Sequence, residues 1–155
     1  MLKIWYLIPI VIILDQVTKF LAISNIGVFE QVTIIPGVLS FTHVLNSGAF
    51  LGIFSEHNNL LSITATIIIC GLFVFLWLRG TVSRLLRLAI VLTVGGAIGN
   101  VIDRLVHNAV VDFIKLDFIN FPVFNLADMF ITAGAIMMIW NVLTTNHKEE
   151  DNHEN

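Results

Sequence analysis

One stretch, LLSITATIIICGLFVFLWL at residues 60–78, constrains this chain most, because it is apolar and carries no charge. A helix needs about 20 apolar residues to cross the hydrocarbon core of a bilayer. Three other segments have a similar length and character, so the sequence predicts four spans at roughly 4–23, 58–78, 86–106 and 126–144. The composition agrees, since only 12% of the residues are charged, against about 25% in soluble domains.

These spans predict a mainly α membrane protein, a four-transmembrane-helix bundle that forms one domain over residues 1–147. The polar segment that follows, residues 148–155, has no apolar periodicity, and we expect it to be a disordered tail. The first span has the apolar length of a signal peptide, but Asp15 and Lys19 interrupt it where a signal peptide would be neutral. We therefore expect it to remain as an uncleaved span.

Basic residues predict the orientation of the spans, because they concentrate on the cytoplasmic side. The connection at 24–57 has no Lys or Arg, and the connection at 107–125 has only Lys115. Both termini and the short connection after the second span are therefore expected in the cytoplasm, with the two longer connections outside. The basic residues near the cytoplasmic span ends are Lys3, Arg79, Arg84, Arg87 and Lys148.

The two outer connections carry patterns of their own. VTII and LSFTHV, within an outer segment at about 28–55, read as two short strands joined by a Pro-Gly turn. They predict a small extracytoplasmic β-sheet on the bilayer surface. The 107–125 connection predicts a short interfacial helix around Ile114–Ile119, which ends before Pro122.

Several kinds of site are disfavoured by the composition. The one cysteine, Cys70, lies in an apolar run and has no partner for an internal disulfide. The five histidines lack the spacing of metal ligands, and there is no Gly-rich phosphate motif. The net charge of -3 comes largely from the tail, and no segment is basic enough for nucleic acid. We expect no metal, no organic cofactor and no nucleic-acid partner.

Polar residues inside the spans are costly and are therefore candidates for function. In DQVTK, Asp15 and Lys19 lie four residues apart on one helical face. They can form a simple ion pair, with Lys19 reaching towards the outer interface, or they can support a site. In NSGAF, Asn46 offers donors and an acceptor, and Gly48 allows backbone to approach a ligand. From the spacing alone, an ordinary turn at the end of a strand accounts for NSGAF better than a binding site does.

The motif GGAIGNVIDR closes the third span. Gly95 and Gly99 form a GxxxG pattern, which is typical of close helix packing. Asn100, Asp103 and Arg104 follow on one helical face. Arg104 can pair with Asp103 at the interface, or its planar guanidinium can hold a peptide carbonyl or a carboxylate.

The remaining carboxylates lie around the start of the fourth span. In FNLAD, Asn125 and Asp128 have the spacing of a helix N-cap and its capping partner. Asp112, in the apolar VVDF, has no such capping role. If Asp112 and Asp128 meet, they share a proton and can act as base and acid on an attacking water. A proton or cation site would use the same residues.

Two other classes of protein fit parts of this pattern. A small proton- or cation-coupled transporter would use Asp15, Asp103, Asp112 and Asp128, but three of these four lie near one face of the membrane. A non-catalytic assembly protein would use the GxxxG packing, but it gives no reason for carboxylates flanked by asparagines. Neither class has a role for Asp117.

Taken together, DQVTK, NSGAF, GGAIGNVIDR, VVDF and FNLAD, in this order on four spans, resemble the bacterial lipoprotein signal peptidase (signal peptidase II) family. The resemblance implies an aspartic endopeptidase that removes the signal peptide from diacylglyceryl-modified prolipoproteins, N-terminal to the lipidated cysteine. It implies a multi-pass, monomeric enzyme of the bacterial cytoplasmic membrane, in contact with lipid, with its active site near the extracytoplasmic face.

The resemblance also implies roles for individual residues. The catalytic pair is Asp112 and Asp128, which activate a water without a metal. Asp103 is expected to be structural. The residues implied to bind substrate or to support the pair are Asn46, Gly48, Asn100, Arg104, Asn125, Asp15 and Lys19.

Overall fold

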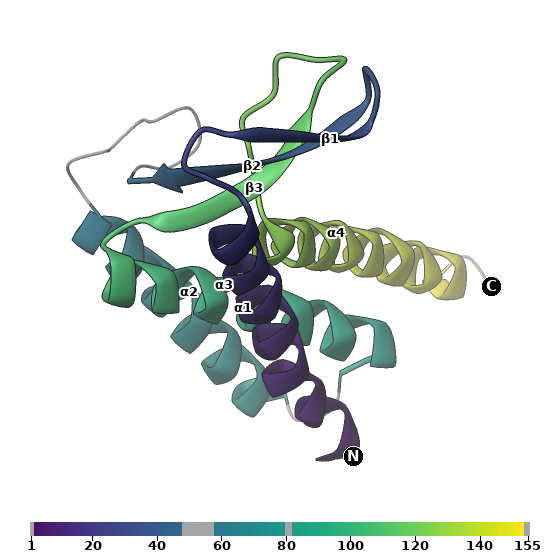
Figure 1. The fold of residues 1–155 in the computed structure, drawn as a ribbon. Helices are drawn as coiled ribbons and strands as arrows, with labels where there is room; N and C mark the ends of the chain where they lie inside the picture. The colour runs from purple at the N-terminus through teal and green to yellow at the C-terminus, as the bar shows by residue number, and fades with distance from the viewer. Residues whose placement is uncertain (1, 48–57, 80–81, 154–155) are drawn as a thin grey trace.

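The computed structural model describes residues 2–47, 58–79 and 82–153. A small sheet lies across one end of a set of long helices (Figure 1). A short 3₁₀ helix, Leu2–Tyr6, leads into the first of these helices. The other elements are α1 (Leu7–Asn25), β1 (Gln31–Ile35), β2 (Leu39–Asn46), α2 (Asn58–Arg79), α3 (Arg84–His107), β3 (Val110–Leu116) and α4 (Leu126–His153).

Helix α3 lies at the centre of the helical part and contacts α1, α2 and α4. Its apolar window is 56% buried, compared with 22% for α1 and 11% for α4. The outer helices expose large apolar side chains instead, such as Phe20 on α1 and Trp140 on α4. This distribution fits helices whose outer faces meet lipid, since lipid covers apolar side chains as well as a protein core does.

Glycines allow α3 to approach its neighbours closely. A Cβ atom on Gly95 would lie 2.6 Å from Cγ1 of Val11, and a Cβ atom on Gly99 would collide with the carboxylate of Asp15. The GxxxG pattern therefore marks close helix packing, as the sequence predicts, and the structure identifies the two helices as α1 and α3. On another face of α3, a Cβ on Gly96 would lie 2.6 Å from the backbone oxygen of Ala127 at the start of α4.

Within the part of the chain that the structure describes, three helical segments are long and apolar enough to cross a membrane: Ile4–Asn25, Arg84–His107 and Leu126–Thr144. Within the described residues, the apolar part of α2 is the shorter segment Ile63–Phe75. The structure thus supports a multi-pass membrane protein, and the second predicted span, in α2, stays a prediction.

The sheet is antiparallel, with strand order β1-β2-β3. The two strands predicted from VTII and LSFTHV are confirmed, and the chain turns between them at Pro36 and Gly37. Gly37 has φ of 72°, a left-handed conformation that costs glycine little. Strand β2 is central, and it pairs with β3 through Val44 opposite Asp112.

The interfacial helix predicted around Ile114–Ile119 is wrong, because Val110–Leu116 forms strand β3 and residues 117–120 form a turn. The segment VVDFIKL is rich in β-branched and aromatic residues, which favour a strand that has a partner. The partner is β2, and the backbone N–H of Ile114 also donates to the oxygen of Phe124 at 2.8 Å. Because this segment is hydrogen-bonded to neighbouring backbone on both sides, it does not need the hydrogen bonds of a helix.

Two other expectations concern the ends of segments. Helix α4 continues to His153, so residues 148–153 are helical where the sequence predicts a disordered tail. Lysine and glutamate are good helix formers, and extending an existing helix costs little. The outer segment expected at about 28–55 is described only as far as residue 47, so Gly48 and the last two residues of NSGAF lie outside the described residues.

Candidate active site

Strand β3 brings Asp112 into the interior. Residues 110–113 are all buried, because β3 pairs with β2 and also contacts α1 and α3. Asp112 is only 2% exposed, and each of its carboxylate oxygens accepts a hydrogen bond. Asn46 Nδ2 donates to Oδ2 at 2.8 Å, and Asn125 Nδ2 donates to Oδ1 at 2.6 Å.

Asp128 occupies the first turn of α4. The backbone N–H of Asp128 donates to Asn125 Oδ1 at 2.9 Å, and the backbone N–H of Asn125 donates to Asp128 Oδ2 at 3.2 Å. This reciprocal pair confirms the predicted capping box, which satisfies two backbone donors at the helix start. The cap uses only Oδ2 of Asp128, so its Oδ1 is left to accept from Asn100 Nδ2 at 2.9 Å.

Two asparagine amides connect the two carboxyl groups. Asn125 Nδ2 donates to Asp112 and also to Asn100 Oδ1, at 3.2 Å. Asn100 in turn donates to Asp128. A continuous hydrogen-bonded path therefore runs from Asp112 through Asn125 and Asn100 to Asp128, and it holds the two carboxyl groups in one local arrangement.

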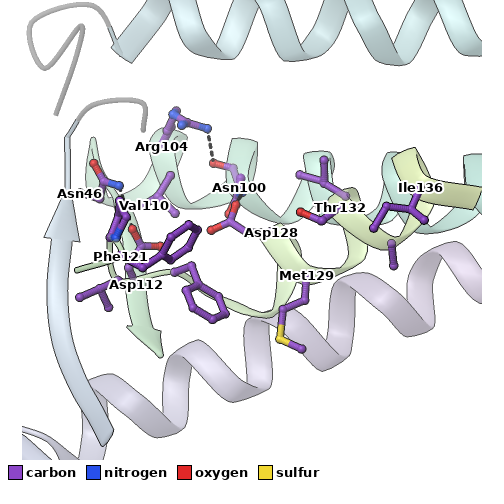
Figure 2. A pocket seen from close by; sticks show the side chains of 15 residues that line it. Asn46, Asn100, Arg104, Val110, Asp112, Phe121, Asp128, Met129, Thr132 and Ile136 are labelled. Atoms are coloured by element: carbon purple, nitrogen blue, oxygen red, sulfur yellow. Dashed lines mark hydrogen bonds between the residues drawn. The ribbon is translucent and has the colours of Figure 1, made fainter. Parts of the chain in front are cut away.

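Both carboxyl groups open onto one pocket of about 610 Å³. Figure 2 shows Asp112 on β3 and Asp128 on α4, with Asn46 beside the first and Asn100 beside the second. The rest of the lining is largely apolar and includes Phe121 from the loop before α4. A pocket with an apolar wall and a few converging polar groups has the general form of a ligand site.

The environment of Asp112 raises its pKa to about 7. The main cause is burial, which penalises the charged carboxylate, and the nearby charge of Asp128 acts in the same direction. The hydrogen bonds from Asn46 and Asn125 and the charge of Lys19 oppose the shift. Asp112 can therefore hold a proton at near-neutral pH, which a general acid requires.

Arg104 also lines the pocket, on the last turns of α3. Its Nη1 donates weakly to the backbone oxygen of Asn100 at 3.4 Å (Figure 2). Its Nε is buried and has no hydrogen-bond partner within the described residues. The predicted alternative, an interfacial pair with Asp103, does not fit, because Asp103 bonds to Lys19 at 2.9 Å. A guanidinium with a spare donor beside two carboxyl groups can hold a substrate oxygen.

The ion pair expected in DQVTK is present, with Lys19 Nζ 2.9 Å from Asp15 Oδ2. The idea that Lys19 reaches the outer interface is wrong, since Lys19 is 2% exposed. Its ammonium group is instead held by Asp15, Asp103 and the Oδ1 of Asn100, the last at 2.9 Å. Three acceptors compensate for the loss of hydration.

Sequence reasoning missed one member of this group and left one aspartate without a role. Gln16 donates to both Asp15 and Asp103, and only its place next to Asp15 could have indicated this. Asp117 lies away from the pocket, where it accepts hydrogen bonds from Ser40 and Gln31 and links the three strands. Its contribution is to the sheet.

The chain closely resembles known proteins over nearly its whole length. The family model for signal peptidase (SPase) II matches residues 7–144. A lipoprotein signal peptidase of Microcystis aeruginosa is 40% identical, covering 93% of this chain and 92% of the relative. One from Shewanella oneidensis is 38% identical, covering 97% and 92%.

Solved structures agree. One bacterial membrane enzyme, determined by the in meso method, has a TM-score of 0.88 at 34% identity, covering 94% of this chain and 91% of its own. A second has a TM-score of 0.84 at 34% identity, covering 92% and 94%. The region matched by the family model, residues 7–144, contains every residue that lines the pocket.

Proposed function

Since the chain belongs to the signal peptidase II family, we propose that it is a membrane aspartic endopeptidase that removes the signal peptide from prolipoproteins. The substrate carries a diacylglyceryl group on the cysteine next to the cleavage site, and the bond cut is N-terminal to that cysteine. The observation that carries the proposal is the pair of carboxyl groups, Asp112 and Asp128, that open onto one apolar pocket.

The reaction is a hydrolysis in which water is activated between the two carboxyl groups. One carboxylate removes a proton from the water, and the resulting hydroxide attacks the carbonyl carbon of the scissile peptide bond. The C–N bond then breaks, and the departing nitrogen takes a proton from the other carboxyl group. The products are the signal peptide with a free carboxylate and the lipoprotein with a free amino group on its cysteine.

We assign the acid and the base from the surroundings of each carboxyl group. Asp112 is the acid, because a pKa raised to about 7 lets it carry a proton at near-neutral pH. Asp128 is the base, because it is the other carboxyl group that opens onto the pocket, where Asn100 and the backbone N–H of Asn125 donate to it and hold it in place. After each turnover the proton gained by Asp128 returns to Asp112 directly or through solvent.

The neighbouring polar groups orient the substrate and the carboxyl groups. Asn46 and Asn125 hold Asp112, and Asn100 holds Asp128. Arg104 supplies a donor for a carbonyl oxygen of the bound peptide. The apolar wall, which continues along α4 to Ile136, accepts the acyl chains and the apolar signal segment.

The same proposal places the chain in the bacterial cytoplasmic membrane as a four-span monomer, in which α2 is a span in addition to α1, α3 and α4. Both termini lie in the cytoplasm. The sheet lies at the ends of the helices where α1 and α3 finish and α4 begins. This end is the extracytoplasmic one if the basic residues near the opposite ends obey the usual bias. The pocket then lies near the outer face, where a lipidated substrate can enter from the bilayer.

The function is tested by cleavage of a purified prolipoprotein in detergent, with lipidated and unlipidated substrate compared. Mass spectrometry of the products is expected to find cysteine as the new N-terminus, and only from the lipidated form. A chelator is expected to leave the rate unchanged, since carboxyl groups alone activate the water. Cleavage at another bond, equal cleavage of both substrates, or inhibition by the chelator would contradict the proposal.

A further inference from the structure

Three charged side chains are buried next to the proposed catalytic pair. Asp15 is 0% exposed, and Lys19 and Asp103 are each 2% exposed. The ammonium group of Lys19 lies 2.9 Å from Asp15 Oδ2 and 2.9 Å from Asp103 Oδ2. Lysine thus joins a carboxylate of its own helix, α1, to a carboxylate of α3.

Each of these carboxylates also holds the backbone immediately before one member of the proposed pair. Asp103 Oδ2 accepts from the backbone N–H of Val111 at 3.0 Å, and Val111 precedes Asp112. Asp15 Oδ1 accepts from the backbone N–H of Ala127 at 2.9 Å, and Ala127 precedes Asp128. Hydrogen bonds to a charged acceptor are about twice as strong as neutral ones.

Stability alone does not account for such a group. Replacing a buried ion pair by apolar side chains of similar volume is often neutral or stabilising, because desolvation offsets the attraction. What apolar side chains lack is the ability to fix two backbone N–H groups at defined points. The two points fixed here lie on different elements, β3 and α4. The loop just before α4 is also bonded to β3, through the Asn125 side chain and the Phe124 backbone.

We propose that Asp15, Lys19 and Asp103 form a positioning unit that sets the separation of the Asp112 and Asp128 carboxyl groups. The inference rests on the proposed function and gives it a structural cause. Lys19 holds the two anchoring carboxylates together, and these hold the backbone of β3 and of α4 in turn. The unit touches neither the water nor the peptide, so its members are positioning residues.

Two further contacts tie the unit together. Gln16 Nε2 lies 2.9 Å from Asp103 Oδ1 and 3.2 Å from Asp15 Oδ2, so it joins the same two carboxylates as Lys19. Lys19 Nζ also donates to Asn100 Oδ1, which connects the unit to the amides between the catalytic carboxyl groups. At Gly99, a side chain would displace the carboxylate of Asp15, so the unit needs a glycine there.

The test compares variants that disturb the unit with a buried control that does not. Gln16→Met removes one link without leaving a buried charge unpaired, and Gly99→Ala pushes on Asp15 from outside the unit. Asp103→Ala removes the acceptor for Val111, whereas Asp103→Asn keeps an oxygen that can accept. The control is Thr93→Ala, because Thr93 is a buried polar residue on α3 whose hydroxyl donates to the Ala89 oxygen of the same helix.

The measurements are kcat and KM on the lipidated substrate, and Tm in the same detergent. A displacement of about 1 Å can lower catalysis about 100-fold, so we expect kcat to fall about 10- to 100-fold in Gln16→Met and Gly99→Ala. KM should stay within about twofold, because the pocket lining is intact. Asp103→Asn should recover much of the kcat that Asp103→Ala loses. Thr93→Ala should lower Tm at most, with native kcat for the folded enzyme.

The inference is overturned if Gln16→Met and Gly99→Ala fold and cleave with native kcat. It is also overturned if these variants lose no more kcat than Thr93→Ala does at the same loss of Tm. Asp112→Asn, assayed in the same way, distinguishes a failure of the proposed catalytic pair from a failure of the positioning role. If it cleaves at the native rate, the catalytic pair itself is wrong. If it is inactive while the unit variants have native kcat, only the positioning role is wrong.

Discussion

At the scale of a single residue, opposing interactions act on the pKa of Asp112. Burial and Asp128 favour its protonated form, whereas Asn46, Asn125 and Lys19 favour its charged form. As a result its pKa lies near neutral pH. Enzymes that use proton transfer usually have a catalytic group whose pKa is close to the pH at which the enzyme works. The rate should therefore report the protonation of this side chain.

As pH rises through about 7, the Asp112 carboxyl group loses its proton and kcat/KM should fall. Asn46 donates to this carboxylate and lowers its pKa, so Asn46→Ala should raise the pKa and move the alkaline limb to higher pH. The check is a profile of kcat/KM against pH for both proteins, with Asp117→Asn as the control. An alkaline limb that stays in place or moves to lower pH in Asn46→Ala would contradict the assignment of Asp112 as the acid.

The residue scale is also where the sequence was most informative. Motifs alone named Asp112, Asp128, Asn100 and Asn125, because carboxylates and amides are costly in an apolar run unless they serve a site. What the motifs did not predict is which groups pair. Lys19 bonds to Asp103 of another helix, a contact that no spacing within one helix could indicate.

At the scale of elements, the correct and the incorrect strand predictions have the same physical origin, which is the sequence distance between paired strands. Strands β1 and β2 were predictable because a Pro-Gly turn joins them and their pairing is local. Strand β3 was missed because its partner β2 is distant in sequence. Its first four residues are also all buried, so it lacks the alternation that marks a strand with one solvated face.

Helix packing leads to a prediction at the same scale. A Cβ on Gly96 would lie 2.6 Å from the backbone oxygen of Ala127, so Gly96→Ala should push the start of α4 away and displace Asp128. We expect a loss of about 1–3 kcal/mol of stability from overpacking and a lower kcat. Gly71→Ala on α2 is the matched control, since its Cβ would meet nothing within 4 Å.

Thermal unfolding in detergent and the cleavage rate check this pair of variants. Gly71→Ala should be as stable as the native protein or more so, because alanine favours a helix by up to about 1 kcal/mol over glycine. Equal behaviour of the two variants would show that the α3–α4 approach tolerates a methyl group. The close approach would then not be what places Asp128.

At the scale of the whole molecule, the sheet meets the ends of the helices (Figure 1), and the pocket is lined by residues from both. Its polar residues come from β2, α3, β3 and α4, so no single element forms the site. A sheet at one end of a bundle and basic residues near the other end give the molecule two distinct sides. The proposed orientation follows from that asymmetry.

Cysteine labelling in intact cells tests this orientation, in a Cys70→Ser background that removes the chain's one thiol. Two substitutions introduce the label sites: Asn120→Cys in the exposed turn after β3, and Val82→Cys between α2 and α3. A membrane-impermeant maleimide should label position 120 from outside, and position 82 only after permeabilisation. Labelling of both positions from outside would contradict α2 as a membrane span.

The most direct test of the catalytic pair is the single-turnover cleavage rate of Asp112→Asn, Asp128→Asn and the double variant. Asparagine keeps the shape of each carboxyl group but removes proton transfer, so each single change should lower the rate by about 10²–10⁴-fold. The double variant should lose little more, because residues that act as a unit are not additive. Asp117→Asn, a third aspartate of the same segment, should cleave at the native rate. A folded Asp112→Asn or Asp128→Asn protein that cleaves at the native rate would contradict the account.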